Sequence, residues 1–399
     1  MNIIEDYDKY IMKTYARFPL VFTRGKGAWL YTDSDKKILD MSSGIAVSSL
    51  GHKNSGLIGA IKKQCDKLLH TSNLYYSEPC LELAKKLIDN SIFAKAFFCN
   101  SGAEANEAAI KLSRKYGNSA GSGKKYKILT MKNSFHGRTI ATLTATGQTK
   151  YQKGFEPLLE GFDYVEFNNV DDMKSKFSSE VAAVIVELVQ GEGGIITVDY
   201  GFLKETRALC DKYNAIMIFD EIQTGCGRTG KLFGYEHFPE ARPDIVTLAK
   251  GLAGGVPIGA MLVNDKYCDV LLPGEHASTF GGNLLASAAA CEVIDALLSD
   301  NMLENIAKTG EYFREKLNEL KSKYTQITDV RGIGLMNCIE VNMDCRVIIQ
   351  QLIENGVLTV PSGTRVIRFL PPLIIKKEEI DFAIGKLEEV FSKGSKVES

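Results

Sequence analysis

The sequence lacks any apolar run near the roughly 20 residues that a helix needs to cross a bilayer. Its 48 Lys and Arg are balanced by 49 Asp and Glu, which leaves a formal net charge of -1. A chain without a basic surplus has no global field to attract nucleic acid or an anionic membrane. We therefore expect neither as a partner. The first residues are acidic and have no apolar segment, so we expect a cytoplasmic protein without a secretion signal.

The number and spacing of the cysteines and histidines differ from those of disulfide-stapled or metal-bound scaffolds. The nine cysteines are an odd number and never lie closer than the seven-residue step from Cys338 to Cys345. The five histidines show no H-x-x-x-H spacing. These patterns favour reduced thiols in a cytoplasm and indicate neither a disulfide framework nor a metal site.

The 399 residues are enough for two or three domains. Short β-branched or aromatic runs alternate with amphipathic segments, a pattern typical of βαβ units around a mostly parallel sheet. The predicted strands are residues 95–99, 126–131, 181–186, 215–219, 245–248 and 258–263, with a crossover helix over 202–214. After residue 282 a long helix over 303–320 precedes strands at 330–341 and 366–370 and a last helix from about 378. This part predicts a smaller α+β domain.

Two glycine motifs suggest other chemistries. GNSAG at residues 117–121 matches a nucleophile elbow, but a predicted helix precedes it and a strand follows, which reverses the required order. We predict a surface loop over residues 117–125. GCGRTG at residues 225–230 follows a strand and keeps a dinucleotide-binding oxidoreductase as an alternative of a different class. Asp220 and Glu221 stand where a pyrophosphate would approach, so a glycine-rich active-site loop is favoured.

The segment NSGAEANE at residues 100–107 joins the first predicted strand to a helix with small residues in its first turn. Open N–H groups and the helix dipole would make this turn a phosphate site. Alternatively, Ser101 and Glu104 form only a capping box. The segment by itself does not decide between these interpretations.

Two charged residues follow predicted strands. Asp220 comes after the strand at 215–219, at an edge where open α/β sheets bind ligands, and a buried carboxylate there needs a cationic partner. Lys250 ends the run DIVTLAK and precedes Gly251, where desolvation can lower its pKa and make it a nucleophile. Taken separately, each of these two residues is more often an ordinary charge at the end of a strand. A phosphate cradle, a carboxylate and such a lysine are together what pyridoxal 5'-phosphate requires.

These segments, with others along the chain, resemble the class III (ornithine-type) aminotransferases of PLP fold type I and, among them, the bacterial acetylornithine branch. The resemblance extends nearly from end to end and is carried by nine motifs: SGIAV (43–47), SNLYYSEP (72–79), FCNSGAEANE (98–107), SFHGRT (134–139), QGEGG (190–194), FDEIQTG (219–225), LAKG (248–251), STFGGN (278–283) and RFLPP (368–372). It implies an α/β fold with a mostly parallel seven-stranded sheet in a large domain, residues 53–277. Residues 1–52 and 278–399 would form the small α+β domain.

The resemblance also implies roles for single residues. Lys250 and Asp220 would be catalytic, with Lys250 binding the cofactor covalently and Asp220 pairing with its ring nitrogen. The other implied cofactor contacts are Ser101, Gly102, Ala103, Phe135, Gln223 and Thr279, the last from a partner subunit. The implied substrate contacts are Arg138, Glu192, Ser278 and Arg368, with Glu192 and Arg368 as a switchable pair.

The reaction expected from this resemblance is N2-acetyl-L-ornithine plus 2-oxoglutarate giving N-acetyl-L-glutamate 5-semialdehyde plus L-glutamate, in arginine biosynthesis. Succinyl-diaminopimelate, from lysine biosynthesis, is a second candidate donor. Ornithine and 4-aminobutyrate aminotransferases are the alternatives within the family. Ornithine enzymes tend to carry a tyrosine where this chain has Gly44 and Ile45, which favours the acylated donor. Partners are thus amino donors and 2-oxo acids, and the expected assembly is a homodimer with shared active sites.

Overall fold

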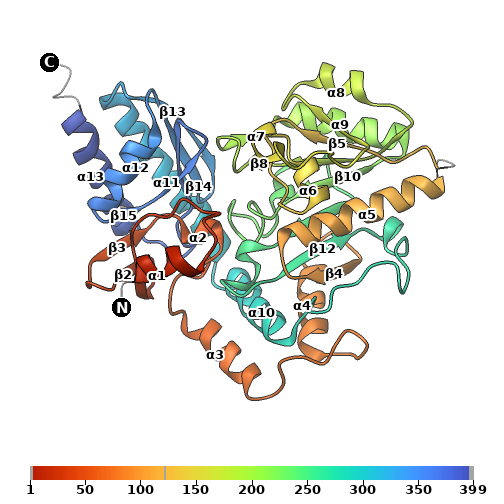
Figure 1. Ribbon diagram of the computed structural model, residues 1–399, viewed down its shortest axis with the longest axis horizontal. Coiled ribbons are helices and arrows are strands. Elements are labelled where there is room, and N and C mark those ends of the chain that lie inside the picture. Colours follow the sequence, from red (N-terminus) through yellow and green to blue (C-terminus); the bar gives the residue numbers. More distant parts are fainter. Residues whose placement is uncertain (1–2, 121–122, 395–399) are drawn as a thin grey trace.

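The structure is a computed structural model that describes residues 3–120 and 123–394. Figure 1 shows two lobes: the middle of the chain, in yellow and green, forms one, and the two ends, in red and blue, meet in the other. Within the described ranges no helix is both long and apolar enough to span a membrane.

The larger lobe is built on a seven-stranded sheet of order β4-β12-β11-β10-β7-β5-β6. Its strands are β4 (Lys95–Cys99), β5 (Lys127–Met131), β6 (Phe162–Val165), β7 (Val181–Glu187), β10 (Ile216–Asp220), β11 (Ile245–Leu248) and β12 (Gly259–Val263). Neighbours pair in parallel except β12, which runs antiparallel to both β11 and β4. The mostly parallel seven-stranded sheet is therefore confirmed.

Helices cover both faces of this sheet, which is why its central strands are continuous apolar runs. The helices are α5 (Gly102–Ala120), α6 (Ile140–Ala145), α7 (Thr149–Gln152), α8 (Val170–Lys176) and α9 (Tyr200–Tyr213). Successive side chains of a strand point to opposite faces. Ile218 of β10 accordingly packs in the cluster that contains Ala109 of α5, whereas Phe219 packs with Phe202 of α9.

The smaller lobe joins the two ends of the chain. Its first sheet has the order β1-β2-β3-β15, with β15 parallel to β3, and its second has the order β13-β14-β17-β16. The strands are β1 (Phe22–Lys26), β2 (Trp29–Thr32), β3 (Lys37–Asp40), β13 (Ile327–Ile333), β14 (Met336–Val341), β15 (Val357–Leu358), β16 (Val360–Ser362) and β17 (Val366–Phe369). The predicted α+β character of this part is thus confirmed.

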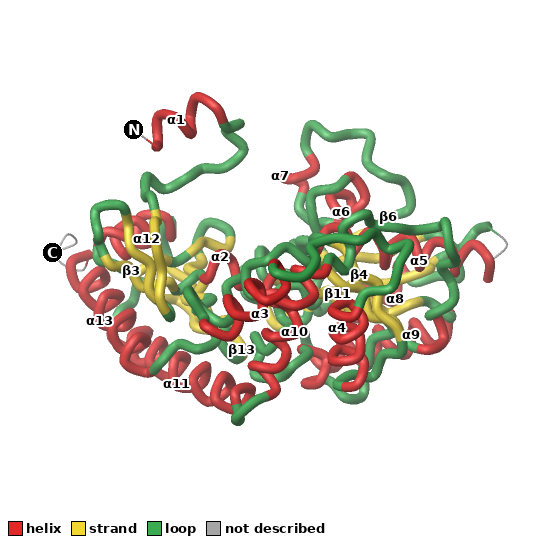
Figure 2. The backbone as a smooth tube through the Cα atoms, turned by 90° about the horizontal axis from the view of Figure 1, so that it is seen from below, coloured by secondary structure: helices red, strands yellow, loops and turns green. Residues whose placement is uncertain are grey.

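The remaining helices surround these sheets. They are α1 (Ile3–Tyr10), α2 (Ser43–Ala46), α3 (Ser55–Cys65), α4 (Glu78–Asp89), α10 (Leu284–Leu298), α11 (Met302–Lys323), α12 (Cys345–Glu354) and α13 (Lys377–Gly394). Short 3-10 turns and a two-stranded ribbon complete the set: η1 (Gly234–His237), η2 (Lys250–Ala253), η3 (Asp265–Tyr267), β8 (Val189–Gln190) and β9 (Ile196–Thr197). Figure 2 shows α1 standing clear of the rest, and it has no buried residue. The domain boundaries after residues 52 and 277 stay predictions.

The local predictions hold for the sheet and fail at one loop. All six predicted strands match observed strands to within one residue at each end, but β6 was missed. The surface loop predicted from residue 117 is wrong, because α5 continues to Ala120 and Gly117 is buried against the backbone of Lys125. Close packing overrides the low helix propensity of Gly and Ser here. The rest of that prediction includes residues 121–122, which lie outside the described ranges.

Candidate active site

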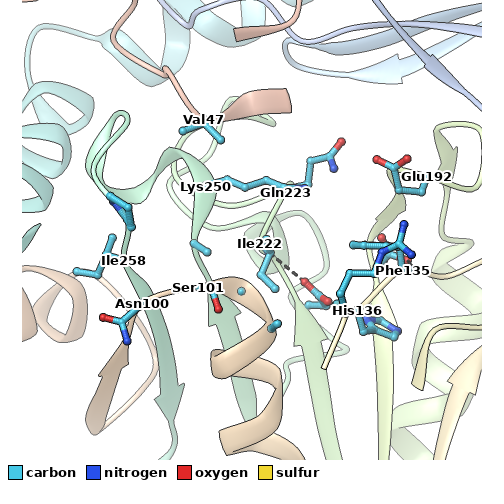
Figure 3. Close-up of a pocket in the computed structure, with 18 of the residues that line it drawn as sticks. Val47, Asn100, Ser101, Phe135, His136, Glu192, Ile222, Gln223, Lys250 and Ile258 are labelled. Carbon is cyan, nitrogen blue, oxygen red and sulfur yellow. Dashed lines mark hydrogen bonds and ion pairs between the residues drawn. The ribbon is translucent and has the colours of Figure 1, made fainter. Parts of the chain in front are cut away.

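A cavity of about 400 Å³ lies where the larger lobe faces the smaller one. Its walls are segments that follow β4, β5, β7, β10 and β11, in agreement with the rule that α/β sheets bind ligands at strand carboxyl ends. In Figure 3, Asn100 and Ser101 enter from one side and Phe135 and His136 from the other. Nine predicted site residues line this cavity: Ser101, Gly102, Ala103, Phe135, Arg138, Glu192, Asp220, Gln223 and Lys250.

The start of α5 offers backbone donors to the cavity. Ser101 Oγ accepts from the N–H of Glu104 at 3.2 Å, while the Glu104 carboxylate accepts from the N–H of Asn100 at 2.5 Å. The cap leaves the first-turn N–H groups of Gly102 and Ala103 without an intrahelical acceptor. A side chain at Gly102 would lie 2.6 Å from Ile222, so the close approach requires glycine. The capping interpretation is confirmed, and the same turn keeps donors free for the anion-binding interpretation, which stays a prediction.

Asp220 ends β10 with only 4% of its surface exposed. Its Oδ2 accepts from His136 Nδ1 at 2.7 Å and from Asn106 Nδ2 at 2.8 Å, and its Oδ1 accepts from the backbone N–H of Ile222 at 3.1 Å. The expected cationic partner of this carboxylate is therefore His136. Burial disfavours the charged imidazole, but the hydrogen bond and charge of Asp220, with the charge of Glu187, outweigh burial and raise the pKa of His136.

Lys250 begins η2 directly after β11 and its side chain enters the cavity. Burial lowers the pKa of Lys250; the carboxylate of Glu192 opposes this shift, and the guanidinium of Arg368 adds to it. The backbone of Lys250 adopts φ +40°, an uncommon value for a residue with a side chain. Such strain is found where function requires a particular side-chain position.

Arg368 of β17 is 1% exposed and reaches the cavity wall from the smaller lobe. Its Nη1 donates to Glu192 Oε1 at 2.7 Å, to Gln223 Oε1 at 3.0 Å and to the carbonyl of Gly191 at 2.7 Å. The structure thus places the predicted pair of Arg368 and Glu192 in direct contact. It also connects that pair to Gln223, a contact that the sequence did not indicate.

Arg138 is a second cation at the cavity and is exposed. Its guanidinium lies 4.1 Å from the ring centroid of Tyr151 and 5.4 Å from that of Phe135. Within residues 3–120 and 123–394 no carboxylate lies within ion-pair distance of Arg138. The cation is therefore held by aromatic faces and remains available to an anion from solvent.

Ser278 and Thr279 lie outside this cavity. They line a neighbouring cavity of about 340 Å³ together with Asn100, Glu104 and Phe280. Ser278 Oγ accepts from Asn100 Nδ2 at 3.1 Å, and Thr279 is exposed. The roles predicted for these two residues stay predictions.

Three buried polar residues of the site had no predicted role: Asn106, His136 and Glu187. His136 directly follows Phe135 in the SFHGRT motif. Glu187 ends β7, accepts from the N–H of Phe135 at 3.0 Å, and has its pKa raised to about 7, chiefly by burial. The signal in the sequence was that Glu187 follows a predicted strand, as Asp220 does. The structure aligns the two residues in neighbouring strands.

The glycine motif at residues 225–230 packs against helices of the chain itself. A side chain at Gly227 would lie 2.7 Å from Leu297 of α10, and one at Gly230 would lie 2.8 Å from Ala307 of α11. The motif opens no helix, since η1 begins only at Gly234. The glycines therefore serve interhelical packing, which removes the basis for a dinucleotide site.

Comparison with known proteins places this geometry in a family. The model for "Aminotransferase class-III" matches residues 10–391. The chain is 49% identical over 385 residues to the acetylornithine aminotransferase of Caldanaerobacter subterraneus subsp. tengcongensis, covering 96% of this chain and 98% of the relative. The corresponding relative in Methanocaldococcus jannaschii is 47% identical, with 98% of both chains covered.

Solved structures agree with the sequence relatives. The ornithine aminotransferase of Toxoplasma gondii superposes with a TM-score of 0.94 at 32% identity, covering 99% of this chain and 95% of that one. The N-acetylornithine aminotransferase of Stenotrophomonas maltophilia gives 0.85 at 35% identity, covering 99% and 100%. The chain belongs to the class-III aminotransferases, enzymes that use pyridoxal 5'-phosphate.

Proposed function

We propose that this enzyme transfers the amino group of N2-acetyl-L-ornithine to 2-oxoglutarate, giving N-acetyl-L-glutamate 5-semialdehyde and L-glutamate, as a step of arginine biosynthesis. The observation that carries the substrate is the near 49% identity, over almost the whole chain, to a relative named acetylornithine aminotransferase. The site supports it with two cations, Arg138 in the cavity lining and Arg368 against the lining residues Glu192 and Gln223, and with Lys250, whose lowered pKa favours its neutral form. Succinyl-diaminopimelate is a second candidate donor.

The residues of the cavity fit pyridoxal 5'-phosphate. The Gly102 and Ala103 N–H groups would hold the phosphate, Asp220 would face the ring nitrogen, and Lys250 would bind the aldehyde carbon. Ser101, Phe135 and Gln223 would complete the pocket. The close approach required at Gly102 is the structural observation behind this fit, because an added Cβ would close the donor end of the cavity. When bound, the cofactor stores the amino group and its ring accepts electrons from the broken C–H bond.

The chain's own contribution to catalysis is proton transfer and charge placement. A lysine with a lowered pKa is more often neutral, so Lys250 Nζ can take a proton from the carbon that bears the donor's amino group. The same Nζ would then deliver that proton to the aldehyde-derived carbon of the cofactor. The Asp220 carboxylate, held by His136 and Asn106, would keep a proton on the ring nitrogen of a bound cofactor. The apolar ring of Phe135 excludes water from one wall.

Two different substrates must use one cavity. Arg138 would bind the carboxylate common to both. Glutamate brings a second carboxylate on its reacting carbon that would need Arg368, whereas the reacting carbon of the acylated donor bears no carboxylate. Pairing with Glu192 at 2.7 Å would neutralise Arg368 for the acylated donor, and displacement of Glu192 would expose it for glutamate.

A panel of amino donors tests the substrate. Purified holoenzyme would be assayed with 2-oxoglutarate and each of acetylornithine, succinyl-diaminopimelate, ornithine and 4-aminobutyrate, with Lys250→Ala as the blank. We expect the highest kcat/KM with acetylornithine and no turnover by Lys250→Ala, which lacks both nucleophile and proton carrier. A highest value with ornithine or 4-aminobutyrate would move the chain to that branch of the family.

We further propose that the enzyme is a cytoplasmic homodimer that shares its active sites. Thr279 is exposed and outside its own cavity, as a residue that serves a partner's phosphate must be. Large apolar side chains stand exposed near it in sequence or structure: Phe280, Leu74 and Tyr76. All nine cysteines are free, which is compatible with a reducing compartment.

A further inference from the structure

A chain of hydrogen bonds runs behind Asp220 through three elements of the larger lobe. Thr247 Oγ1, on β11, donates to Asn106 Oδ1, on α5, at 2.8 Å. Asn106 Nδ2 then donates to Asp220 Oδ2 at 2.8 Å and to the carbonyl of His136 at 2.8 Å. Thr247 and Asn106 are both fully buried. Neither lines the cavity, so neither touches a substrate.

The surroundings dictate how the Asn106 amide is oriented. The carbonyl of His136 and Asp220 Oδ2 both accept from Asn106, so the NH₂ group of its amide faces them. The amide oxygen is then turned the other way, into a fully buried position where it needs a donor. The Thr247 hydroxyl is that donor. Removing it would leave the amide oxygen buried without a donor and would remove one of the three contacts that fix the position of Asn106.

The same contacts orient Asp220. Its Oδ2 receives both side-chain donors, Asn106 Nδ2 and His136 Nδ1, whereas its Oδ1 receives only the Ile222 N–H. A carboxylate oxygen has room for two donors, so Oδ1 retains an open site. Asp220 lines the cavity, and this open site is available for the ring nitrogen of a bound cofactor.

Asn106 also lies one turn beyond Gly102 and Ala103 on α5. One rigid helix therefore carries the donors proposed for the phosphate and the amide that holds Asp220. We propose that Asn106 and Thr247 are positioning residues for the transamination: they keep the Asp220 carboxylate aimed at the ring nitrogen, in register with the phosphate site. This inference rests on the proposed function.

The test removes the hydrogen bond from Thr247 to Asn106 without changing a residue that lines the cavity. Thr247→Val keeps the shape and deletes the hydroxyl, and Thr247→Ser restores it. Thr206→Val is the matched control, because Thr206 is equally buried and its hydroxyl donates to a carbonyl within α9, away from the site. Readouts are the Kd of pyridoxal 5'-phosphate for apoenzyme, the single-turnover rate with amino donor, the donor Kd, and the thermal midpoint.

Loss of one neutral hydrogen bond predicts a rate about two- to tenfold lower in Thr247→Val, with the donor Kd unchanged and recovery in Thr247→Ser. A purely structural role predicts equal thermal shifts in both valine variants and no change in rate or cofactor Kd. That result would overturn the inference. A wild-type protein that bound no cofactor, or whose visible band was not bleached by any donor, would instead reject the proposed function and the inference with it.

Asn106→Asp provides an independent pH test. The groups that face Asp220 are His136, Glu187, Glu221 and Lys250. A second carboxyl 2.8 Å from Asp220 Oδ2 holds a proton more firmly, and while protonated it can donate its single O–H to Asp220, although the carbonyl of His136 then loses its donor. We expect single-turnover rates within about threefold of wild type at low pH and a fall of tenfold to hundredfold as that proton is lost. A pH profile parallel to that of wild type would contradict the proposed role of Asn106 in positioning Asp220.

Discussion

Glu192 lies 2.7 Å from the buried Arg368, so its charge decides what that guanidinium presents to a substrate. We predict that Glu192→Ala lowers the single-turnover rate with acetylornithine about tenfold to hundredfold, because a reacting carbon without a carboxylate then meets an unpaired cation. The rate with glutamate should change little. Glu192→Gln, which keeps the size and removes the charge, should resemble Glu192→Ala. Equal losses for the two donors would exclude a switching role.

Glu221 predicts a pH dependence of stability. It is 1% exposed, accepts from the N–H groups of Gly234 and Tyr235, and burial raises its pKa to about 8. The folded pKa lies above the unfolded value near 4.3. The folded state therefore binds more protons, and this contribution to stability is complete below about pH 4 and is lost as pH rises toward 8.

Urea unfolding of apoenzyme from pH 5 to pH 8 measures the effect of Glu221. Wild type should lose up to about 1.4 kcal/mol per pH unit from this group. Glu221→Gln cannot ionise and should show a flatter dependence, although it is less stable at low pH because its NH₂ group must face one backbone N–H. Glu315→Gln, at an exposed helix position, should keep the wild-type slope. Equal slopes in all three proteins would show that Glu221 is ionised throughout.

At the scale of elements, two helical glycines predict opposite signs for one substitution. A side chain at Gly117 of α5 would lie 2.0 Å from the carbonyl oxygen of Lys125, whereas one at Gly59 of α3 would meet nothing within 4 Å. Gly59→Ala should stabilise the protein by about 0.5–1 kcal/mol, since alanine loses less backbone entropy. Gly117→Ala should destabilise it by about 1–3 kcal/mol through overpacking. Chemical denaturation of both variants checks the pair; stabilisation by Gly117→Ala would contradict the observed end of α5.

At the scale of the whole molecule, sharing of sites predicts complementation. Lys250→Ala chains would be mixed with Thr279→Ala chains at limiting cofactor, where loss of one hydrogen bond to phosphate weakens binding about tenfold to hundredfold. If Thr279 serves the partner's site, a mixed dimer has one intact site, and random exchange restores about a quarter of all sites. If Thr279 serves its own site, every site keeps one defect and no activity returns. Subunit exchange would be verified with tagged chains.

The sequence by itself determined the strands and the residues at their ends. β7, β10 and β11 are buried on both faces, so their composition alone marks them, and chemical side chains that follow them, such as Asp220 and Lys250, must meet at one edge of a parallel sheet. Glycine at position 102 likewise indicated a close approach at the start of a helix. Such inferences succeed because each depends on a few neighbouring residues.

Only the tertiary structure decided which side chains pair. Asn106 and Asp220 are 114 residues apart, and Arg368 and Gln223 are 145 apart, so no local pattern relates them. The antiparallel direction of β12 and the helical state of Gly117 were also set by neighbours distant in sequence. A buried polar group must find a partner, but the residue type states only that need. Which partner meets it depends on how the elements pack, and packing is a property of the whole chain.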